Sequence, residues 1–284
     1  FLFRRKYSKE KAIELISNQK YDIVILDKQM PAADGLEVTK HIRKILKYNK
    51  NINKIRIGYL ADGPWSHLAF EKIIQDDLIE IVFIVPRSNT NDKTLKDFSI
   101  KYNIDYLHPV SINSLEFIET AKSYNVDLLV SMSFNQIFKS SILSVPKFGV
   151  INCHAGKLPF YRGRNILNWA IINGETKTGV TSFFIDDKID TGEMILQEAV
   201  AIDSNETAGS LHDKLMHLGS KLVLKTVSLI EKGPVKTTPQ TDSEAIKTAH
   251  KLDKETCKID WNDTLLNIYN KIRGLSPYPG AWCY

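Results

Sequence analysis

Cysteine is scarce in this chain: Cys153, Cys257 and Cys283 are the only three among 284 residues. Their number is odd and their spacing fits no zinc-binding pattern, which argues against a disulfide framework and a cysteine-based metal centre. We therefore expect reduced cysteines and a cytoplasmic location.

Long apolar runs and a strong charge of one sign are also missing. No run reaches the roughly 18 residues that a membrane-spanning helix needs, so we expect no membrane partner. The 38 basic and 33 acidic residues leave a net charge of +5. This mild excess suits anionic small molecules as well as nucleic acid and does not choose between them.

The dinucleotide-binding pattern Gly-x-Gly-x-x-Gly is absent from the turn at residues 61–64. What this part of the chain does contain is an alternation of apolar strands and amphipathic helices. We expect strands over residues 55–60, 79–85 and 126–132, and helices over residues 65–75, 94–102 and 115–124. This order predicts an α/β fold with a doubly wound, mostly parallel sheet. The missing glycines argue against a dinucleotide cofactor.

Three polar residues follow two apolar runs in the stretch 150–192. Asn152 and His154 end the run 149–153 on the same side of the predicted strand, because side chains alternate along a strand. Asp190 follows a second predicted strand over 180–185. A carboxylate beside an imidazole raises its basicity, and an amide can donate to a developing oxyanion. The set suits acyl transfer onto an amine without an enzyme nucleophile.

The same stretch resembles the folate-dependent formyltransferases, and the resemblance extends from about residue 55 to the end of the chain. It rests on several motifs together: Asn152-Cys153-His154, Leu158-Pro159, Tyr161-Arg162-Gly163 and Asp190-Thr191-Gly192. The run from Arg164 to Trp169 looks more like the sugar N-formyltransferases than the methionyl-tRNA enzyme. The resemblance implies a Rossmann-like formyltransferase fold.

The resemblance also implies roles for individual residues. Asn152, His154 and Asp190 would be catalytic. The cosubstrate 10-formyltetrahydrofolate would be held without a metal by Gln136, Ile137, Phe138, Gly156, Lys157, Leu158, Pro159, Arg164, Asp186, Asp187, Lys188 and Ile189. The amine substrate would contact Asp62, Trp65, Tyr161 and Arg162.

The acceptor implied by this resemblance is the primary amine of a nucleotide-linked amino sugar, with a dTDP-4-amino-4,6-dideoxy sugar expected, in the synthesis of surface polysaccharide such as the O-antigen of lipopolysaccharide. Nucleic acid is then not expected as a partner, and a homodimer is left open. The main alternative is methionyl-tRNA formylation by the same chemistry. Glycinamide ribonucleotide formyltransferase shares the Asn, His and Asp set, but the predicted helix 207–231 argues against it.

Residues 1–47 follow a different pattern, a partial receiver-like α-β-α segment resembling response regulators. There the strand 22–27 ends in Asp27, a doubtful phospho-acceptor, because the expected acidic pair and lysine are not in place. A signalling module phosphorylated at Asp27 is the alternative of another class. We expect a linker over 48–54, a catalytic domain over 55–233, and the start of a truncated C-terminal region over 234–284. We also expect the chain to be a fragment.

Overall fold

The computed structural model describes residues 2–3, 25–26, 54–241 and 247–284. The chain divides into two units, Phe1–Asn53 and Lys54–Tyr284. In the first unit, β1 (Leu2–Phe3) pairs in parallel with β2 (Ile25–Leu26). Asp27 and most of the predicted receiver-like segment and linker lie outside the described residues, so these assignments stay predictions.

The second unit is built on a seven-stranded sheet in the order β10-β9-β7-β6-β3-β4-β5. Its strands are β3 (Ile55–Ala61), β4 (Ile79–Val85), β5 (Asp105–Tyr106), β6 (Leu128–Met132), β7 (Val150–His154), β9 (Lys177–Phe184) and β10 (Met194–Ala201). The strands from β7 to β5 are parallel, whereas β9 is antiparallel to β7 and to β10. The predicted doubly wound, mostly parallel α/β sheet is confirmed.

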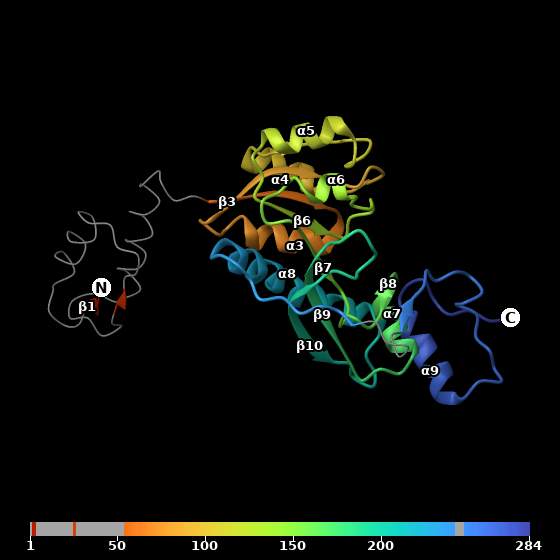
Figure 1. The fold of residues 1–284 in the computed structure, drawn as a ribbon. Coiled ribbons are helices and arrows are strands. Elements are labelled where there is room, and N and C mark those ends of the chain that lie inside the picture. The colour runs from red at the N-terminus through yellow and green to blue at the C-terminus, as the bar shows by residue number, and fades with distance from the viewer. Residues whose placement is uncertain (1, 4–24, 27–53, 242–246) are drawn as a thin grey trace. The chain divides into compact units, whose positions relative to one another are not determined.

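Helices cover both faces of this sheet. They are α3 (Gly63–Ile73), α4 (Thr94–Tyr102), α5 (Leu115–Ser123), α6 (Ser140–Leu143), α7 (Ile166–Ile172) and α8 (Ala208–Glu231). Figure 1 shows α3 and α8 on one side of the sheet and α5 and α6 on the other. No helix in the described ranges is long and apolar enough to cross a membrane.

The core follows from the alternation of side chains along the strands. On β6, Leu128 and Val130 pack in the cluster shared with α3 and α8, whereas Leu129 between them packs in the cluster shared with α5 and α6. Gly58 lies on the α5 side, where an added Cβ would lie 2.6 Å from a methyl carbon of Leu129. The sheet is therefore buried on both faces, as its continuous apolar runs require.

The strand order reverses beside β3. The chain runs from β3 outward to β4 and β5, then returns to place β6 on the other side of β3. The loops that leave β3 and β6 consequently diverge, and ligands of open parallel sheets bind in the crevice at such a point.

Strand β9, which precedes Asp186, Asp187 and Asp190, is antiparallel to its neighbour β7. We had expected these aspartates at the carboxyl end of a parallel strand. In the antiparallel register of β9 and β7, His154 lies opposite Thr181 and Phe184 lies opposite Ile151. The chain after β9 must therefore fold back to reach His154. A hydrogen bond from Phe184 N to Glu193 O (2.9 Å) closes this hairpin loop.

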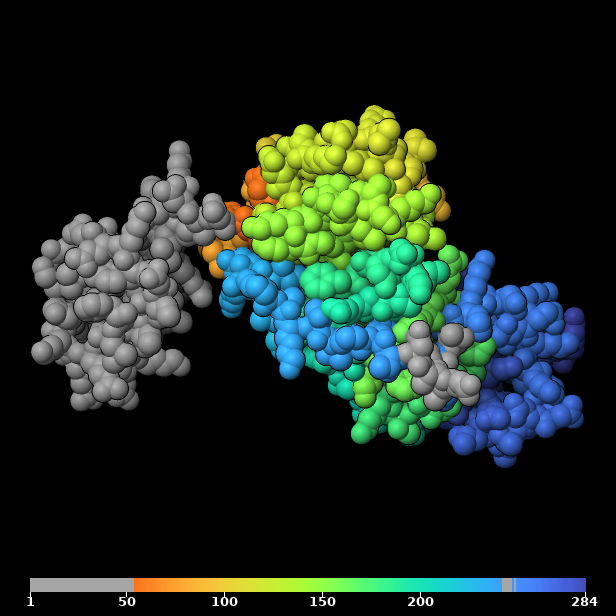
Figure 2. Space-filling view, in the orientation of Figure 1, coloured from red at the N-terminus to blue at the C-terminus, as the bar shows by residue number. Residues whose placement is uncertain are grey.

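The C-terminal residues pack on the helix that follows the catalytic loop. In α9 (Leu265–Gly274), Gly274 crosses α7 so closely that an added Cβ would lie 2.8 Å from Ile172 Cγ1. Asn168 of α7 donates to Gly274 O (2.7 Å), and the buried Arg273 donates to Glu206 O (3.0 Å). Figure 2 shows the surface of these C-terminal residues, in blue, continuous with the green surface around α7.

Candidate active site

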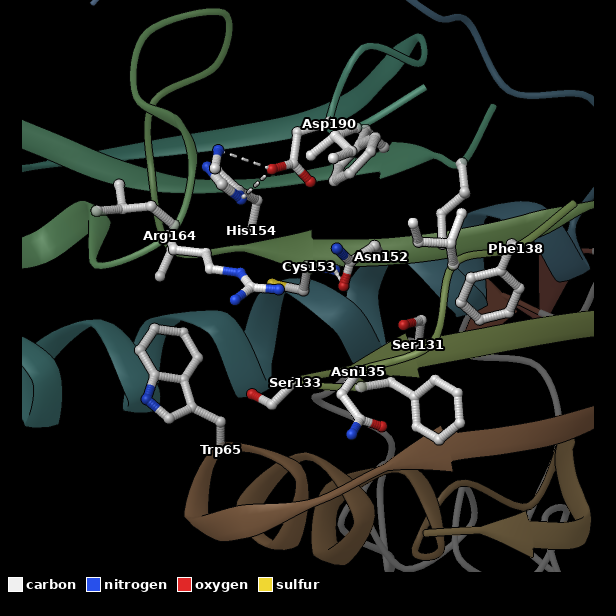
Figure 3. Close-up of a pocket in the computed structure, with 18 of the residues that line it drawn as sticks. Trp65, Ser131, Ser133, Asn135, Phe138, Asn152, Cys153, His154, Arg164 and Asp190 are labelled. Atoms are coloured by element: carbon white, nitrogen blue, oxygen red, sulfur yellow. Dashed lines mark hydrogen bonds and ion pairs between the residues drawn. The ribbon is translucent and has the colours of Figure 1, made fainter. Parts of the chain in front are cut away.

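A cleft of about 590 Å³ opens at the carboxyl ends of β3, β6 and β7. Its size suits a small organic ligand. The residues that line it come from the ends of β6 and β7 and the loops after them, from the end of β9 and the hairpin loop that follows it, and from the N-terminal parts of α3, α7 and α8. Asn152, His154 and Asp190 all belong to the lining, so the three residues predicted to be catalytic are brought together in one site (Figure 3).

His154 is buried, with 5% of its side chain exposed, and both of its ring nitrogens face oxygen atoms. Nε2 lies 2.9 Å from the main-chain carbonyl of Tyr161, and Nδ1 lies 3.6 Å from Asp190 Oδ2. Because a carbonyl oxygen can only accept, the proton of the neutral ring is on Nε2. The lone pair on Nδ1 therefore faces Asp190, and the tautomer is fixed by the Tyr161 carbonyl rather than by the carboxylate.

Asp190 reaches the imidazole from the folded-back hairpin loop. Its backbone is in the left-handed region, with φ of 55°, which an aspartate tolerates better than most residues. Oδ2 accepts a hydrogen bond from Gly163 N (3.1 Å) as well as facing His154. Among the described residues no donor lies within hydrogen-bonding reach of Oδ1. This oxygen is left for a donor on a substrate.

Asn152 is held by its own strand in a defined orientation. Its Oδ1 accepts from Cys153 N (2.9 Å), so its Nδ2 group is the end that remains for a ligand. In Figure 3 the amide nitrogen lies on the side of the cleft that carries His154 and Asp190. The adjacent Cys153 is not a nucleophile, because burial raises the pKa of its thiol to about 12.

The residues predicted to hold the cosubstrate divide into two groups. Those in the lining of the cleft are Gln136, Ile137, Phe138, Arg164, Asp186, Lys188 and Ile189. Those outside it are Gly156, Lys157, Leu158, Pro159 and Asp187. The turn 156–159 is anchored on the sheet instead, since Thr181 bonds Gly156 O and Leu158 N, and Gln197 donates to Leu158 O.

Of the residues predicted to contact the amine substrate, only Trp65 lines the cleft. The Tyr161 hydroxyl points away and donates to Glu175 Oε1 (2.6 Å). Arg162 donates to Gln240, and Asp62 accepts from Thr90 Oγ1 (2.6 Å). These three side chains hold loops in place.

The carboxyl of Glu175 joins the loop that follows β7 to the segment before β11 (Thr248–Ala249), because Tyr161 and Lys247 both donate to its Oε1. Burial opposes its charge, but hydrogen bonds from Lys247 and Tyr161 outweigh burial and hold the pKa of Glu175 below its ordinary value. Burial and the hydrogen bond to Glu175 raise the pKa of Tyr161. The pair therefore consists of an ionised carboxylate and a neutral phenol at neutral pH.

Several lining residues were not predicted. Those with polar side chains are Ser131, Ser133, Asn135, Asn165, Asn168 and His212, and the others include Phe134, Ile166, Leu167, Phe183 and Ile185. Trp65 Nε1 donates to His212 Nε2 (2.7 Å), which connects α3 to α8 in the wall of the cleft. A histidine within an amphipathic helix gives no sequence signal of such a contact. In the described part of the chain, no group of His, Cys, Asp and Glu could hold a metal ion.

Comparisons with known proteins identify the family. A profile of the formyl transferase family matches residues 70–227, and one of the formyl transferase C-terminal domain matches residues 251–284. The methionyl-tRNA formyltransferase of Flavobacterium johnsoniae is 50% identical over 240 residues, which cover 82% of this chain and 76% of that protein. That of Flavobacterium psychrophilum is 49% identical over 237 residues, covering 81% and 75%.

Solved structures share the fold at lower identity. The N-formyltransferase of Helicobacter canadensis, in complex with folinic acid and dTDP-3-aminofucose, superposes with a TM-score of 0.63 at 23% identity. The match covers 78% of this chain and 80% of that one. A likeness at this identity establishes the fold alone.

These relatives correct two predictions. A nucleotide-linked amino sugar as acceptor, with a role in surface polysaccharide synthesis, is wrong, because the relatives at 49–50% identity are methionyl-tRNA formyltransferases. The expectation that nucleic acid is not a partner is wrong for the same reason. The run 164–169 misled, because it looked like the sugar enzymes although relatives at this identity are methionyl-tRNA formyltransferases. The chain itself is an N-formyltransferase that belongs to the folate-dependent formyltransferase family.

Proposed function

We propose that the chain transfers the formyl group of 10-formyltetrahydrofolate to the amine of methionyl-tRNA. The observation that carries this proposal is the 50% identity to a methionyl-tRNA formyltransferase over 82% of the chain, together with an amide, an imidazole and a carboxylate in one cleft. The proposed activity implies a cytoplasmic location, where charged tRNA is used.

The cosubstrate fits the end of the cleft near Phe138. In the described structure, none of the backbone N–H groups of residues 134–138 donates to another residue, which leaves donors for the polar edge of a flat heterocycle. The loop is nevertheless firm, because Asn113 donates to Ile137 O (2.9 Å) and Gln136 Oε1 accepts from Ile112 N (2.9 Å). Ile185 and Ile189 supply an apolar wall. When bound, 10-formyltetrahydrofolate supplies the formyl group on a nitrogen that can leave.

His154 removes the proton of the attacking amine. With Nε2–H donating to Tyr161 O, Nδ1 holds the free lone pair and accepts this proton as the amine nitrogen bonds to the formyl carbon. The resulting imidazolium has both N–H groups facing oxygen atoms, the Tyr161 carbonyl and Asp190 Oδ2. The carboxylate thereby stabilises the charged ring, and the same proton then passes to the leaving folate nitrogen.

Asn152 stabilises the charge that develops on the formyl oxygen. Its Nδ2 donates to this oxygen while Oδ1 stays bonded to Cys153 N. Removing such a donor costs catalysis about 3 kcal/mol in other enzymes. Asp190 Oδ1 accepts from the amine in this proposal and so orients it before attack.

The acceptor enters at the end of the cleft near Trp65 and Arg164, opposite Phe138 in Figure 3. The indole is fixed by its hydrogen bond to His212, and a thioether packs favourably against an aromatic ring. The methionyl side chain would therefore lie against Trp65. Arg164 lines the cleft and, in the described residues, has no carboxylate partner. Its guanidinium suits a phosphate of the tRNA 3′ end.

The test is a formylation assay on the full chain with 10-formyltetrahydrofolate and methionyl-tRNA, read by mass of the released aminoacyl product. We expect formylmethionine from charged initiator tRNA and none from free methionine. His154→Ala, folded as judged by circular dichroism, should lower turnover by orders of magnitude. A folded wild-type chain that leaves methionyl-tRNA unmodified would overturn the proposal.

A further inference from the structure

The segment between the two family-matched regions crosses the catalytic loops. Residues 237–252, of which 242–246 are not described, form a connector that pairs with both sides of the site. Thr238 exchanges backbone hydrogen bonds with Met194, and β11 (Thr248–Ala249) pairs in parallel with β8 (Arg162–Gly163). The connector lies outside the matched ranges 70–227 and 251–284, apart from its last residues.

Gln240, in this connector, uses its whole side-chain amide on the two catalytic loops. Nε2 donates to Asp190 O (3.0 Å) and to Gly192 O (2.7 Å). Oε1 accepts from Arg162 Nε (3.1 Å) and Nη2 (2.9 Å). The opposite orientation of the amide would place an oxygen against two carbonyls, so the arrangement is fixed by chemistry.

These contacts bear directly on the His154–Asp190 pair. One of the carbonyls that Gln240 holds is that of Asp190 itself, whose backbone is left-handed at φ 55°. The arginine that it holds is adjacent to Gly163, whose N–H donates to Asp190 Oδ2. A single amide thus crosslinks the loop that carries the carboxylate to the loop that donates to it.

We propose that Gln240 is a positioning residue for catalysis, which acts by holding Asp190 at Nδ1 of His154. Gln240 does not line the cleft. The inference rests on the proposed catalytic roles of His154 and Asp190. It means that the connector helps to position these two side chains.

The experiment compares kinetics of the full chain with Gln240→Met, which keeps length and loses every amide hydrogen bond. We expect kcat to fall about 10- to 100-fold, as for other residues that orient a reacting group, with KM for both substrates within about twofold. Gln240→Glu keeps an acceptor for Arg162 and places an oxygen against the two carbonyls. It should be impaired as strongly, and it serves if Gln240→Met does not fold.

A matched control comes from the same connector. Thr237 donates to Glu193 of the hairpin loop and, in the described structure, makes no hydrogen bond to Asp190, so Thr237→Val should keep the wild-type kcat. In an Asp190→Asn background, Gln240→Met should add less than a further twofold loss, because its effect passes through Asp190. A full additional loss there, an equal loss in Thr237→Val, or a wild-type kcat in Gln240→Met would overturn the inference. An inactive wild-type chain would instead overturn the proposed function.

Discussion

Replacing Gly156 by alanine tests whether the imidazole must keep its place. An alanine Cβ would lie 3.0 Å from both Cδ2 and Nε2 of His154 and 2.9 Å from Ile166 Cγ2. Ordinary carbon contacts are about 3.5–4.0 Å, so the ring or the isoleucine must move by about 0.5–1 Å. Movement of the ring lengthens the hydrogen bond from Nε2 to Tyr161 O (2.9 Å) and displaces Nδ1 from the reacting amine.

Two magnitudes follow for Gly156→Ala. Overpacking of this kind costs about 1–3 kcal/mol of unfolding free energy. A misplacement of about 1 Å costs up to about 100-fold in rate, so we expect kcat to fall about 10- to 100-fold. Thermal unfolding and steady-state formylation measure the two effects separately.

The double variant Gly156→Ala/Ile166→Ala identifies which neighbour moves. Removing the isoleucine leaves the contact with the imidazole in place, so kcat should stay low. Recovery of kcat in the double variant would mean that Ile166 transmits the strain. A wild-type kcat and melting temperature in Gly156→Ala would refute the reasoning.

Three further outcomes are expected. Tyr161→Phe removes the donor to Glu175 and should cost about 1–2 kcal/mol of stability, with KM for the acceptor unchanged; a higher KM would place the phenol in the cleft. Because hydrogen bonds lower the pKa of Glu175, this carboxylate stabilises the fold above its unfolded pKa and loses that effect as pH falls through the folded value, so Glu175→Gln should flatten the acid limb of a denaturation series. Arg164→Ala should raise KM for charged tRNA several-fold, with the unfolding free energy and the pH dependence of activity unchanged. An unchanged KM would show that Arg164 is not part of the acceptor site.

Local signals were sufficient to predict much of the sheet and its helices. The apolar run at 79–85 is β4, and the helical spacing of apolar residues predicted α8, whose N-cap Thr207 accepts from Ser210 N. Such elements are encoded within a few turns or strand residues, because periodicity and capping are local. The strand before the aspartates was also predicted, but its antiparallel direction depends on pairing with β7, which no local pattern records.

Strand geometry predicted part of the site, and the family resemblance predicted further lining residues such as Arg164 and Lys188. Asn152 and His154 share a side because of strand geometry, and both line the cleft. Other contacts that hold the site join distant positions: Gln240 lies 50 residues from Asp190, and His212 lies 147 residues from Trp65. Motif spacing contains no information on such contacts. The family resemblance implied that Tyr161 contacts the substrate, whereas its hydroxyl donates to Glu175.

The atom that sets the proton of His154 belongs to the polypeptide backbone at Tyr161. Every amino acid has this main-chain carbonyl, whatever its side chain. A substitution at position 161 therefore leaves the tautomer of His154 unaltered unless the loop itself moves. Alanine scanning at position 161 would therefore measure only the loss of the phenol. It would miss the contribution of the carbonyl to the acid–base chemistry of His154. The main chain at this position therefore has a chemical role that does not depend on which side chain it carries.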